Sequence, residues 1–342
     1  MKVFECPNCE SPVFFENTIC KNCNTALGYN PYFDAFEIPN NNQSNFSKLC
    51  TNEAWGVCNW LVDANQNKEF CLACSLNRTV PDRTSNENFE KWKRLEIAKH
   101  RLIYQLLKLR LPIVSKLKKS EGIVFDFLSE NNDKNVLTGH AEGVVTIILS
   151  EADSVHREQL RKQMNEPYRT LLGHFRHEVG HYYWELLFDD SNIESFRQMF
   201  GDERMNYGDA LETHYKNGAP ENWNQNFISE YASSHAWEDW AETWAHYLHI
   251  MDTLETAHSF GMVFQPEKQA VKKLVVTSSL NPYATEDFNV IFEASMALTC
   301  AANSLNRSMG LPDIYPFVVP NKVVEKLTYI HNLLNNSSLV IQ

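Results

Sequence analysis

The stretch Gly173-His-Phe-Arg-His-Glu-Val-Gly-His-Tyr-Tyr-Trp-Glu185 places His177 and His181 four residues apart inside a largely apolar run. At about 100° per residue, His177, Glu178 and His181 fall on one stripe of a helix, and the large apolar side chains face elsewhere. We expect such a helix to be buried, and a buried polar stripe needs partners. The stretch therefore predicts either a metal-binding helix or a histidine-rich core helix.

The pattern HExxH formed by His177, Glu178 and His181 is typical of zinc sites in which two imidazoles bind the ion and the glutamate acts as general base. Such a site needs a third ligand. The extended form HExxHxxGxxH is excluded, because Trp184 and Leu187 stand where its glycine and third histidine would be. A glutamate from a later helix is the usual alternative.

The segment SSHAWEDWAETWAHYLH, residues 233–249, predicts a second helix with a stripe of histidines and acids on an apolar body. No Lys or Arg occurs from residue 217 through 267, so we expect its carboxylates to lack ion-pair partners. We predict Glu238 as the third ligand and Glu242 as an acceptor that orients a ligand histidine. Coordination by Asp239 or Glu242 instead stays open, as does a solvated acidic face.

Eight of the nine cysteines fall within the first 74 residues and form two quartets. Paired CxxC motifs with such spacing indicate metal ligation rather than a disulfide framework. We predict two structural zinc ions, with iron as the alternative at the first quartet. The first quartet is Cys6, Cys9, Cys20 and Cys23, and the second is Cys50, Cys58, Cys71 and Cys74.

Composition narrows the class of protein further. The 342 residues carry a formal net charge of -12, which argues against general nucleic-acid binding. Residues 75–120 are the exception, with twelve Lys or Arg and four Asp or Glu. We expect this segment to be a solvated helix face or to pack near acidic parts of the same protein, with an anionic partner as the alternative. No apolar run has membrane-spanning length and no secretory signal is evident, so we expect a soluble cytoplasmic protein.

The order of predicted elements gives an α+β fold. We expect a double zinc-ribbon module over residues 1–80 and a mainly helical domain with a small β-sheet over residues 81–342. A helix is predicted over 87–111, and strands over 122–128 and 143–149. Later helices are predicted to run from Pro167 to about 188, near 229–256, near 286–306 and near 321–335.

Several long motifs together resemble a bacterial family of zinc-binding metallopeptidases that join an amino-terminal zinc ribbon to a zincin-like domain. The motifs are CPNC, FCLAC, GHAEGVVTI, EPYRTLLGHFRHEVGHYYW, HAWEDWAETWAHYLH and GLPDIYPF, and they cover nearly the whole chain. The resemblance implies a zinc hydrolase without indicating a substrate.

We hypothesise a gluzincin-like peptidase with three zinc ions per chain. The catalytic ion would bind His177, His181 and Glu238, and Glu178 would be the general base. We expect residues 143–150 to be the strand that pairs with an extended peptide substrate. An oxyanion-stabilising donor is also expected, and Tyr231, His235, Tyr247 and Tyr315 are all candidates.

Two other functions are consistent with the sequence. One is a noncatalytic, zinc-stabilised adaptor, and the other is a nucleic-acid-associated zinc protein. The position of Glu178 on the metal-facing stripe favours the peptidase. Its expected partners are a peptide or protein substrate and a protein bound through the ribbon, with neither nucleic acid nor membrane.

Overall fold

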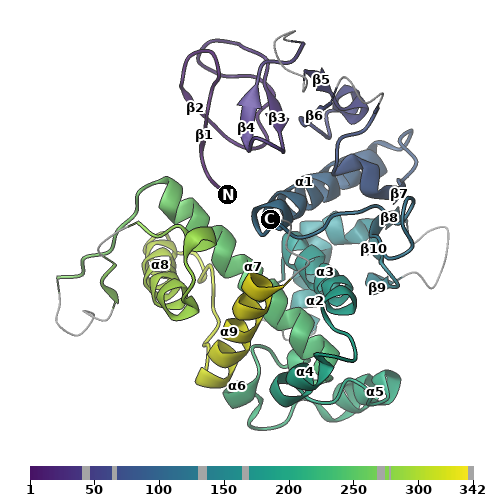
Figure 1. Ribbon diagram of the computed structural model, residues 1–342, viewed down its shortest axis with the longest axis vertical. Coiled ribbons are helices and arrows are strands. Elements are labelled where there is room, and N and C mark those ends of the chain that lie inside the picture. The colour runs from purple at the N-terminus through teal and green to yellow at the C-terminus, as the bar shows by residue number, and fades with distance from the viewer. Residues whose placement is uncertain are drawn as a thin grey trace. The chain divides into compact units, whose positions relative to one another are not determined.

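The computed structural model describes residues 1–40, 47–63, 68–129, 137–163, 169–267, 274–276 and 279–337. The chain divides into two compact units, Met1–His156 and Arg157–Gln342. The first unit contains short hairpins, one long helix and a four-stranded sheet, and the second is helical (Figure 1). The fold is therefore α+β, as the sequence predicts.

Three short antiparallel hairpins form the beginning of the first unit. They pair β1 (Phe4–Glu5) with β2 (Pro12–Val13), β3 (Gly28–Asn30) with β4 (Ala35–Glu37), and β5 (Lys48–Leu49) with β6 (Leu61–Val62). Strands this short bury little surface, so side chains from elsewhere must complete the core. The ring of Phe15 lies 4.9 Å from that of Tyr29 and 5.2 Å from that of Tyr104, which belongs to the following helix.

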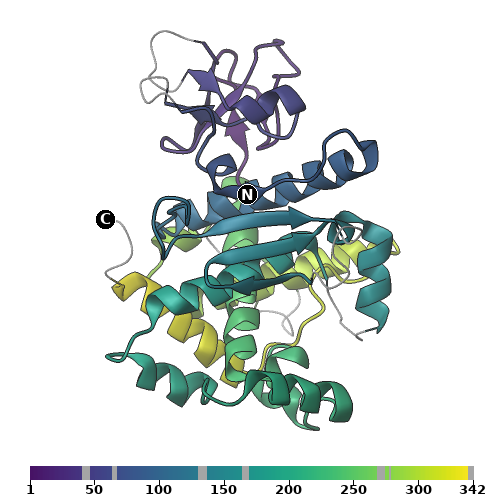
Figure 2. The same ribbon diagram turned by 90° about the vertical axis from the view of Figure 1, so that its right-hand side faces the viewer.

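The long helix α1 (Asn86–Lys108) connects two parallel strands, β7 (Asn77–Thr79) and β8 (Val124–Leu128). Ser85 caps it by accepting a hydrogen bond from the backbone N–H of Asn88. The sheet continues with β10 (Val144–Ile148) and β9 (Gly139–Ala141) in the order β7-β8-β10-β9 (Figure 2). The predicted helix over 87–111 and the two predicted strands are confirmed. Short 3₁₀ helices in this unit span Thr51–Trp55, Cys74–Leu76 and Leu149–Ala152.

Strand β10 is not at an edge of the sheet. It pairs with β8 in parallel and with β9 in antiparallel register. Glu142 and Gly143 form the two-residue loop between β9 and β10, and both have positive φ, as the tight turns of such hairpins require. The expectation that residues 143–150 offer a free edge to a peptide is therefore wrong, because both sides of β10 are occupied. Among the described residues, the outer strands are β7 and β9.

The second unit is organised around the long helix α7 (Ala236–Ser259), which contacts α3, α4, α8 and α9 (Figure 1). Its tryptophans Trp240 and Trp244 are fully buried. Among the described residues, no helix is long and apolar enough to cross a bilayer. The other helices are α2 (Ser154–Gln163), which spans the boundary between the units, α3 (Leu171–Leu187), α4 (Ile193–Phe200), α5 (Tyr207–Asn217), α6 (Trp223–Asn226), α8 (Phe288–Ser308) and α9 (Asn321–Asn336), with 3₁₀ helices at Tyr231–Ser233 and Pro282–Ala284.

The helices predicted near 229–256, 286–306 and 321–335 are confirmed as α7, α8 and α9. Helix α3 begins after Thr170, whose side chain accepts a hydrogen bond from the backbone N–H of Gly173. The predicted start at Pro167 lies outside the described residues. Trp240 donates a hydrogen bond to the carbonyl of Gly180 at 2.9 Å, and this contact joins α7 to the centre of α3.

Candidate metal centres

The first quartet brings its four sulfur atoms together from two matching turns. The carbonyl oxygen of Cys6 accepts a hydrogen bond from the backbone N–H of Glu10, and that of Cys20 accepts one from Asn24. Glu10 and Asn24 both have a φ of 60°. The sulfur atoms of Cys6 and Cys23 are 3.7 Å apart, as are those of Cys9 and Cys20. Four thiolates at about 2.3 Å from a zinc ion would stand about 3.8 Å apart in a tetrahedron, so the spacing fits zinc. A disulfide would need about 2.05 Å.

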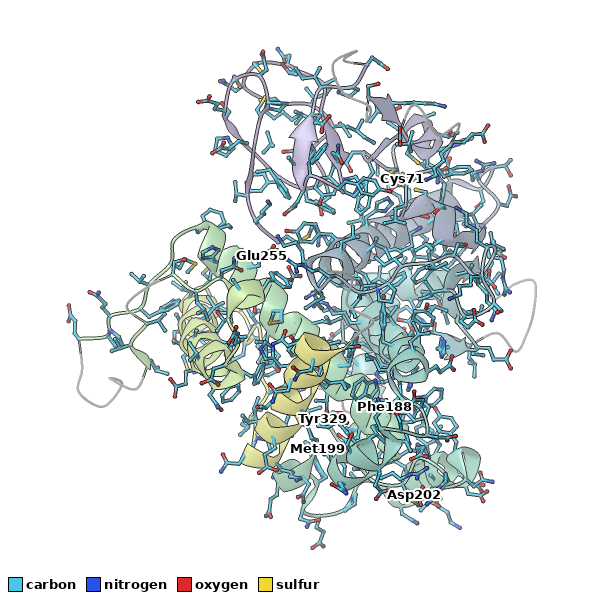
Figure 3. The ribbon with its side chains drawn as sticks, in the orientation of Figure 1. Cys71, Phe188, Met199, Asp202, Glu255 and Tyr329 are labelled. Atoms are coloured by element: carbon cyan, nitrogen blue, oxygen red, sulfur yellow. The ribbon has the colours of Figure 1, made fainter. Side chains whose placement is uncertain are left out.

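The second quartet is more deeply buried than the first. Its four cysteines are all buried, and the sulfur atoms of Cys58 and Cys71 are 3.7 Å apart (Cys71 is labelled in Figure 3). Backbone N–H groups of Trp60, Cys71 and Cys74 each lie 3.4 Å from a sulfur atom of the quartet. Such donors stabilise thiolates, so this cluster also fits a structural zinc ion.

Helix α1 adds a side chain to the second quartet that the sequence did not indicate. The Nε2 atom of His100 lies 3.7 Å from the sulfur of Cys74, and its Nδ1 atom lies 2.7 Å from the carbonyl oxygen of Glu96. Glu96 and Lys99 form a fully buried ion pair beside it, at 2.8 Å. The helical spacing of apolar residues predicts which face of α1 is buried. It does not indicate that Glu96, Lys99 and His100 lie beside the cysteines.

Part of the positive charge of the basic segment 75–120 is neutralised within its own unit. Lys108 pairs with Asp34 at 3.0 Å, Arg101 pairs with Glu16 at 2.6 Å, and Arg78 pairs with Asp126. These contacts favour the expectation that the segment packs near acidic parts of the same protein.

The third cluster joins α3 to α7. His177 and His181 project from α3, and Glu238 projects from the first turn of α7. The Nε2 atoms of the two histidines are 3.2 Å apart, and the Glu238 oxygens lie 3.0 Å from His177 Nε2 and 3.5 Å from His181 Nε2. Ligands at about 2.0–2.1 Å from zinc in a tetrahedron would be about 3.4 Å apart, so this donor set also fits a zinc ion.

Glu242 lies one turn beyond Glu238 and holds the other side of the His177 ring. Its Oε1 atom is 2.7 Å from Nδ1 of His177, and its Oε2 atom accepts a hydrogen bond from Ser229 at 2.7 Å. With Nδ1 as the donor, the lone pair of Nε2 faces Glu238 and His181. Ser229 is a further residue that the sequence did not indicate.

Electrostatics keep the two carboxylates ionised. Burial opposes ionisation of Glu238, but its close contacts with the rings of His177 and His181 outweigh burial and hold the pKa of Glu238 well below its usual value. Burial likewise opposes ionisation of Glu242, yet contact with His177 lowers its pKa to about 2. The cluster therefore presents negative charge and imidazole nitrogens, the donors that zinc prefers.

Asp239 is turned away from the cluster. Its Oδ2 atom lies 2.6 Å from Nζ of Lys326 on α9, and Lys326 also donates to the carbonyl of Asn226 at 2.7 Å. Burial raises the pKa of Asp239 to about 7, although Lys326 works in the opposite direction. The expectation that these carboxylates lack ion-pair partners is wrong for Asp239, because its partner comes from a distant part of the chain.

Two residues outside the set of metal-ligand candidates bear on this site, Glu178 of α3 and Tyr207 of α5. Glu178 is 9% exposed and lies between the two histidines in the sequence of α3. Tyr207, the first residue of α5, donates a hydrogen bond from its hydroxyl to Oε1 of Glu238 at 2.6 Å. Burial and the charge of Glu238 raise the pKa of Tyr207, so this hydroxyl keeps its proton at neutral pH. Tyr207 lies 31 residues before Glu238 in the sequence, so the spacing of residues within one helix could not indicate this contact.

Four residues were candidates for the oxyanion-stabilising donor. Tyr231 lies beside the third cluster, with its ring centroid 6.1 Å from that of His177. His235 instead caps α7: its Nδ1 accepts from the backbone N–H of Trp237, and its Nε2 is 3.1 Å from the carbonyl of Met205. Tyr247 contacts His331 at 3.0 Å and Tyr315 contacts His246 at 2.6 Å. These three side chains thus have structural hydrogen bonds of their own.

The chain matches known families along most of its length. Residues 88–333 match the model of a family described as "putative zinc-binding metallo-peptidase", and residues 3–85 match a zinc-ribbon domain. The resemblance drawn from the sequence motifs is confirmed, and zinc is the metal that these domains support. Uncharacterized proteins of Mycobacterium tuberculosis (strain H37Rv) and Mycobacterium bovis are 43% identical over 338 residues, covering 98% of this chain and 96% of theirs. No solved structure matches the chain.

Proposed function

This chain belongs to the family of zinc-binding metallo-peptidases described above, and we propose that it is itself a zinc-dependent peptidase. The observation that supports the proposal is the third cluster, in which two imidazoles and one carboxylate stand at the separations of tetrahedral zinc ligands. His177, His181 and Glu238 would hold the catalytic ion. Its substrate would be a peptide or a protein.

Zinc bound by three protein ligands supplies a Lewis acid, which polarises a scissile carbonyl and lowers the pKa of water. Glu178 is the general base in our proposal. Its carboxylate takes a proton from the attacking water and later delivers that proton to the amine that leaves as the peptide bond breaks. Its low exposure keeps the carboxylate out of bulk water.

Glu242 and Ser229 orient His177, the histidine that contacts both Glu238 and His181. Glu242 accepts the Nδ1 proton of His177 and thereby directs the Nε2 lone pair toward Glu238 and His181. Ser229 holds the second oxygen of Glu242, so the carboxylate cannot rotate freely. These two side chains act on the ligand and not on the substrate.

Each cysteine quartet would hold one structural zinc ion, which gives three ions per chain together with the catalytic ion. The structural ions stabilise hairpins that are too short to form a core of their own.

Zinc content is the first test. We expect three equivalents per chain in protein purified without added metal, and two equivalents would favour the noncatalytic adaptor.

The second test is hydrolysis of a fluorogenic peptide library by the wild type and by Glu178→Gln. The variant should lose activity and keep three zinc ions. Glu185→Gln, which changes an exposed glutamate on the same helix, is the matched control and should retain activity. Full activity in Glu178→Gln would contradict the assigned role.

A further inference from the structure

We propose that Tyr207 is a positioning residue that holds Glu238 so that only one carboxylate oxygen is offered to the metal. The inference rests on the proposed zinc site and extends it to a residue from a different helix. The hydroxyl of Tyr207 lies 2.6 Å from Oε1 of Glu238, which is also 3.5 Å from Nε2 of His181. Oε2 lies closer to its histidine, 3.0 Å from Nε2 of His177, and faces the cluster without a hydroxyl donor from the described residues. The two oxygens of one carboxylate therefore have different partners.

The distinction matters because a carboxylate can bind a metal through one oxygen or through both. A catalytic zinc site keeps three protein ligands and leaves a position open for water or substrate. A glutamate that used both oxygens would compete for that position. Tyr207 donates its short hydrogen bond to Oε1 of the charged Glu238. Hydrogen bonds to a charged acceptor are stronger than those between neutral groups, so this bond holds Oε1 in place.

Helix α7 itself sets the position of Tyr207. The Tyr207 ring packs edge to face against His235 and Trp237, with centroid distances of 5.3 and 5.9 Å. His235 also contacts the carbonyl of Met205, two residues before Tyr207, at 3.1 Å. His235 and Trp237 immediately precede Glu238. The first turn of α7 therefore positions both the Tyr207 hydroxyl and the Glu238 carboxylate.

The rest of α5 contributes little to this placement. None of the described side chains of α5 is buried, so no apolar face anchors the helix in the way that α3 and α7 are anchored. Tyr207 is 39% exposed, yet its hydroxyl reaches a carboxylate that is 1% exposed. The buried charge of Glu238, together with the two ring contacts to α7, therefore accounts for the position of this partly exposed tyrosine.

The test is the zinc affinity of the third site, measured by competition with a chelator. Tyr207→Phe keeps the ring contacts and removes only the hydroxyl. We expect the third zinc ion to bind about 10- to 100-fold more weakly, which is the usual effect of losing an outer-shell partner. The two ions held by cysteines should stay bound. Tyr329→Phe is the matched control, because Tyr329, labelled on α9 in Figure 3, contacts Ser195 at the same 2.6 Å and should leave the affinity unchanged.

A double-mutant cycle separates positioning from general destabilisation. In a Glu238→Ala background, Tyr207→Phe should not weaken zinc binding further, because the residue through which it acts is gone. A similar loss in both backgrounds would overturn the inference, as would unchanged affinity in Tyr207→Phe alone. If the wild type holds only two zinc ions, the proposed function fails instead. The two failures are thus distinguishable.

Discussion

Gly180 of α3 lies so close to Ala241 of α7 that a Cβ atom added at Gly180 would come within 3.1 Å of the Ala241 Cα atom. The same added atom would lie 3.1 Å from Cδ1 of Trp244. Neither neighbour is the end of a flexible chain, so the helices would have to move apart. Gly180 stands next to His181, and Ala241 lies three residues after Glu238, so the two helices approach each other closely beside the third cluster.

We predict that Gly180→Ala destabilises the protein and weakens the third zinc site together. Alanine favours a helix by up to about 1 kcal/mol over glycine, but overpacking in a core costs about 1–3 kcal/mol. Urea unfolding and zinc competition would measure the two effects. Gly208→Ala in α5, where the nearest atom to an added Cβ is 3.5 Å away, is the control and should be tolerated. Greater stability in Gly180→Ala would contradict the close approach.

Replacement of Glu242 should weaken zinc binding without removing a ligand. Glu242→Gln keeps an acceptor for Nδ1 of His177 but removes the charge, and we expect a loss of affinity of about tenfold or more. The same chelator competition measures it, with the cysteine-bound ions as internal reference. A fall in the affinity of the third site as large as that in Glu238→Ala would instead indicate that Glu242 coordinates directly.

The ion pair between Asp239 and Lys326 predicts a strong effect on stability. Lys326→Met leaves Asp239 buried without its partner, which costs about 3–5 kcal/mol when a buried pair is broken. Adding Asp239→Asn should recover part of that loss in urea unfolding. Lys322→Met changes a partly exposed lysine that pairs with Glu325 on the same helix, and it should change stability by less than about 1 kcal/mol. Equal effects at both lysines would argue against a buried pair.

His246 should make the protein less stable in acid. Burial is the main reason that its pKa is lowered to about 4, whereas an unfolded histidine titrates near 6.5. Between these values the unfolded chain binds the extra proton, so His246 alone lowers stability by up to about 1.4 kcal/mol per pH unit as pH drops. His249, whose pKa burial lowers to about 3, adds to the same fall. Unfolding at pH 6.5, 5.5 and 4.5 would show this slope. His246→Gln, which keeps an acceptor for Tyr315, should reduce it, and an unchanged slope would contradict the assignment.

The parts of the site that could be predicted from sequence are those governed by one helix at a time. The four-residue spacing of His177 and His181 and that of Glu238 and Glu242 place side chains on one face of a helix whatever surrounds it. The same holds for the CxxC turns, where two nearby cysteines need only a short loop to converge. Hydrophobic periodicity was sufficient to locate the long helices, because their buried faces repeat regularly.

What the sequence could not provide was the identity of partners from distant elements. Lys326 reaches Asp239 across 87 residues, and Tyr207 reaches Glu238 across 31. The strand at 144–148 was expected at an edge because its apolar run gives no indication of how many neighbours pair with it. Periodicity reports which face of an element is buried, but not which element covers it.

The Asp239–Lys326 pair also has a consequence for how the protein is made. A ribosome releases α3 and α7 well before α9, so Asp239 emerges while its cationic partner is not yet synthesised. Until then the carboxylate next to Glu238 has no reason to leave water. The nascent chain can close its cysteine turns early, but Asp239, the neighbour of Glu238, gains its cationic partner only after α9 has left the exit tunnel.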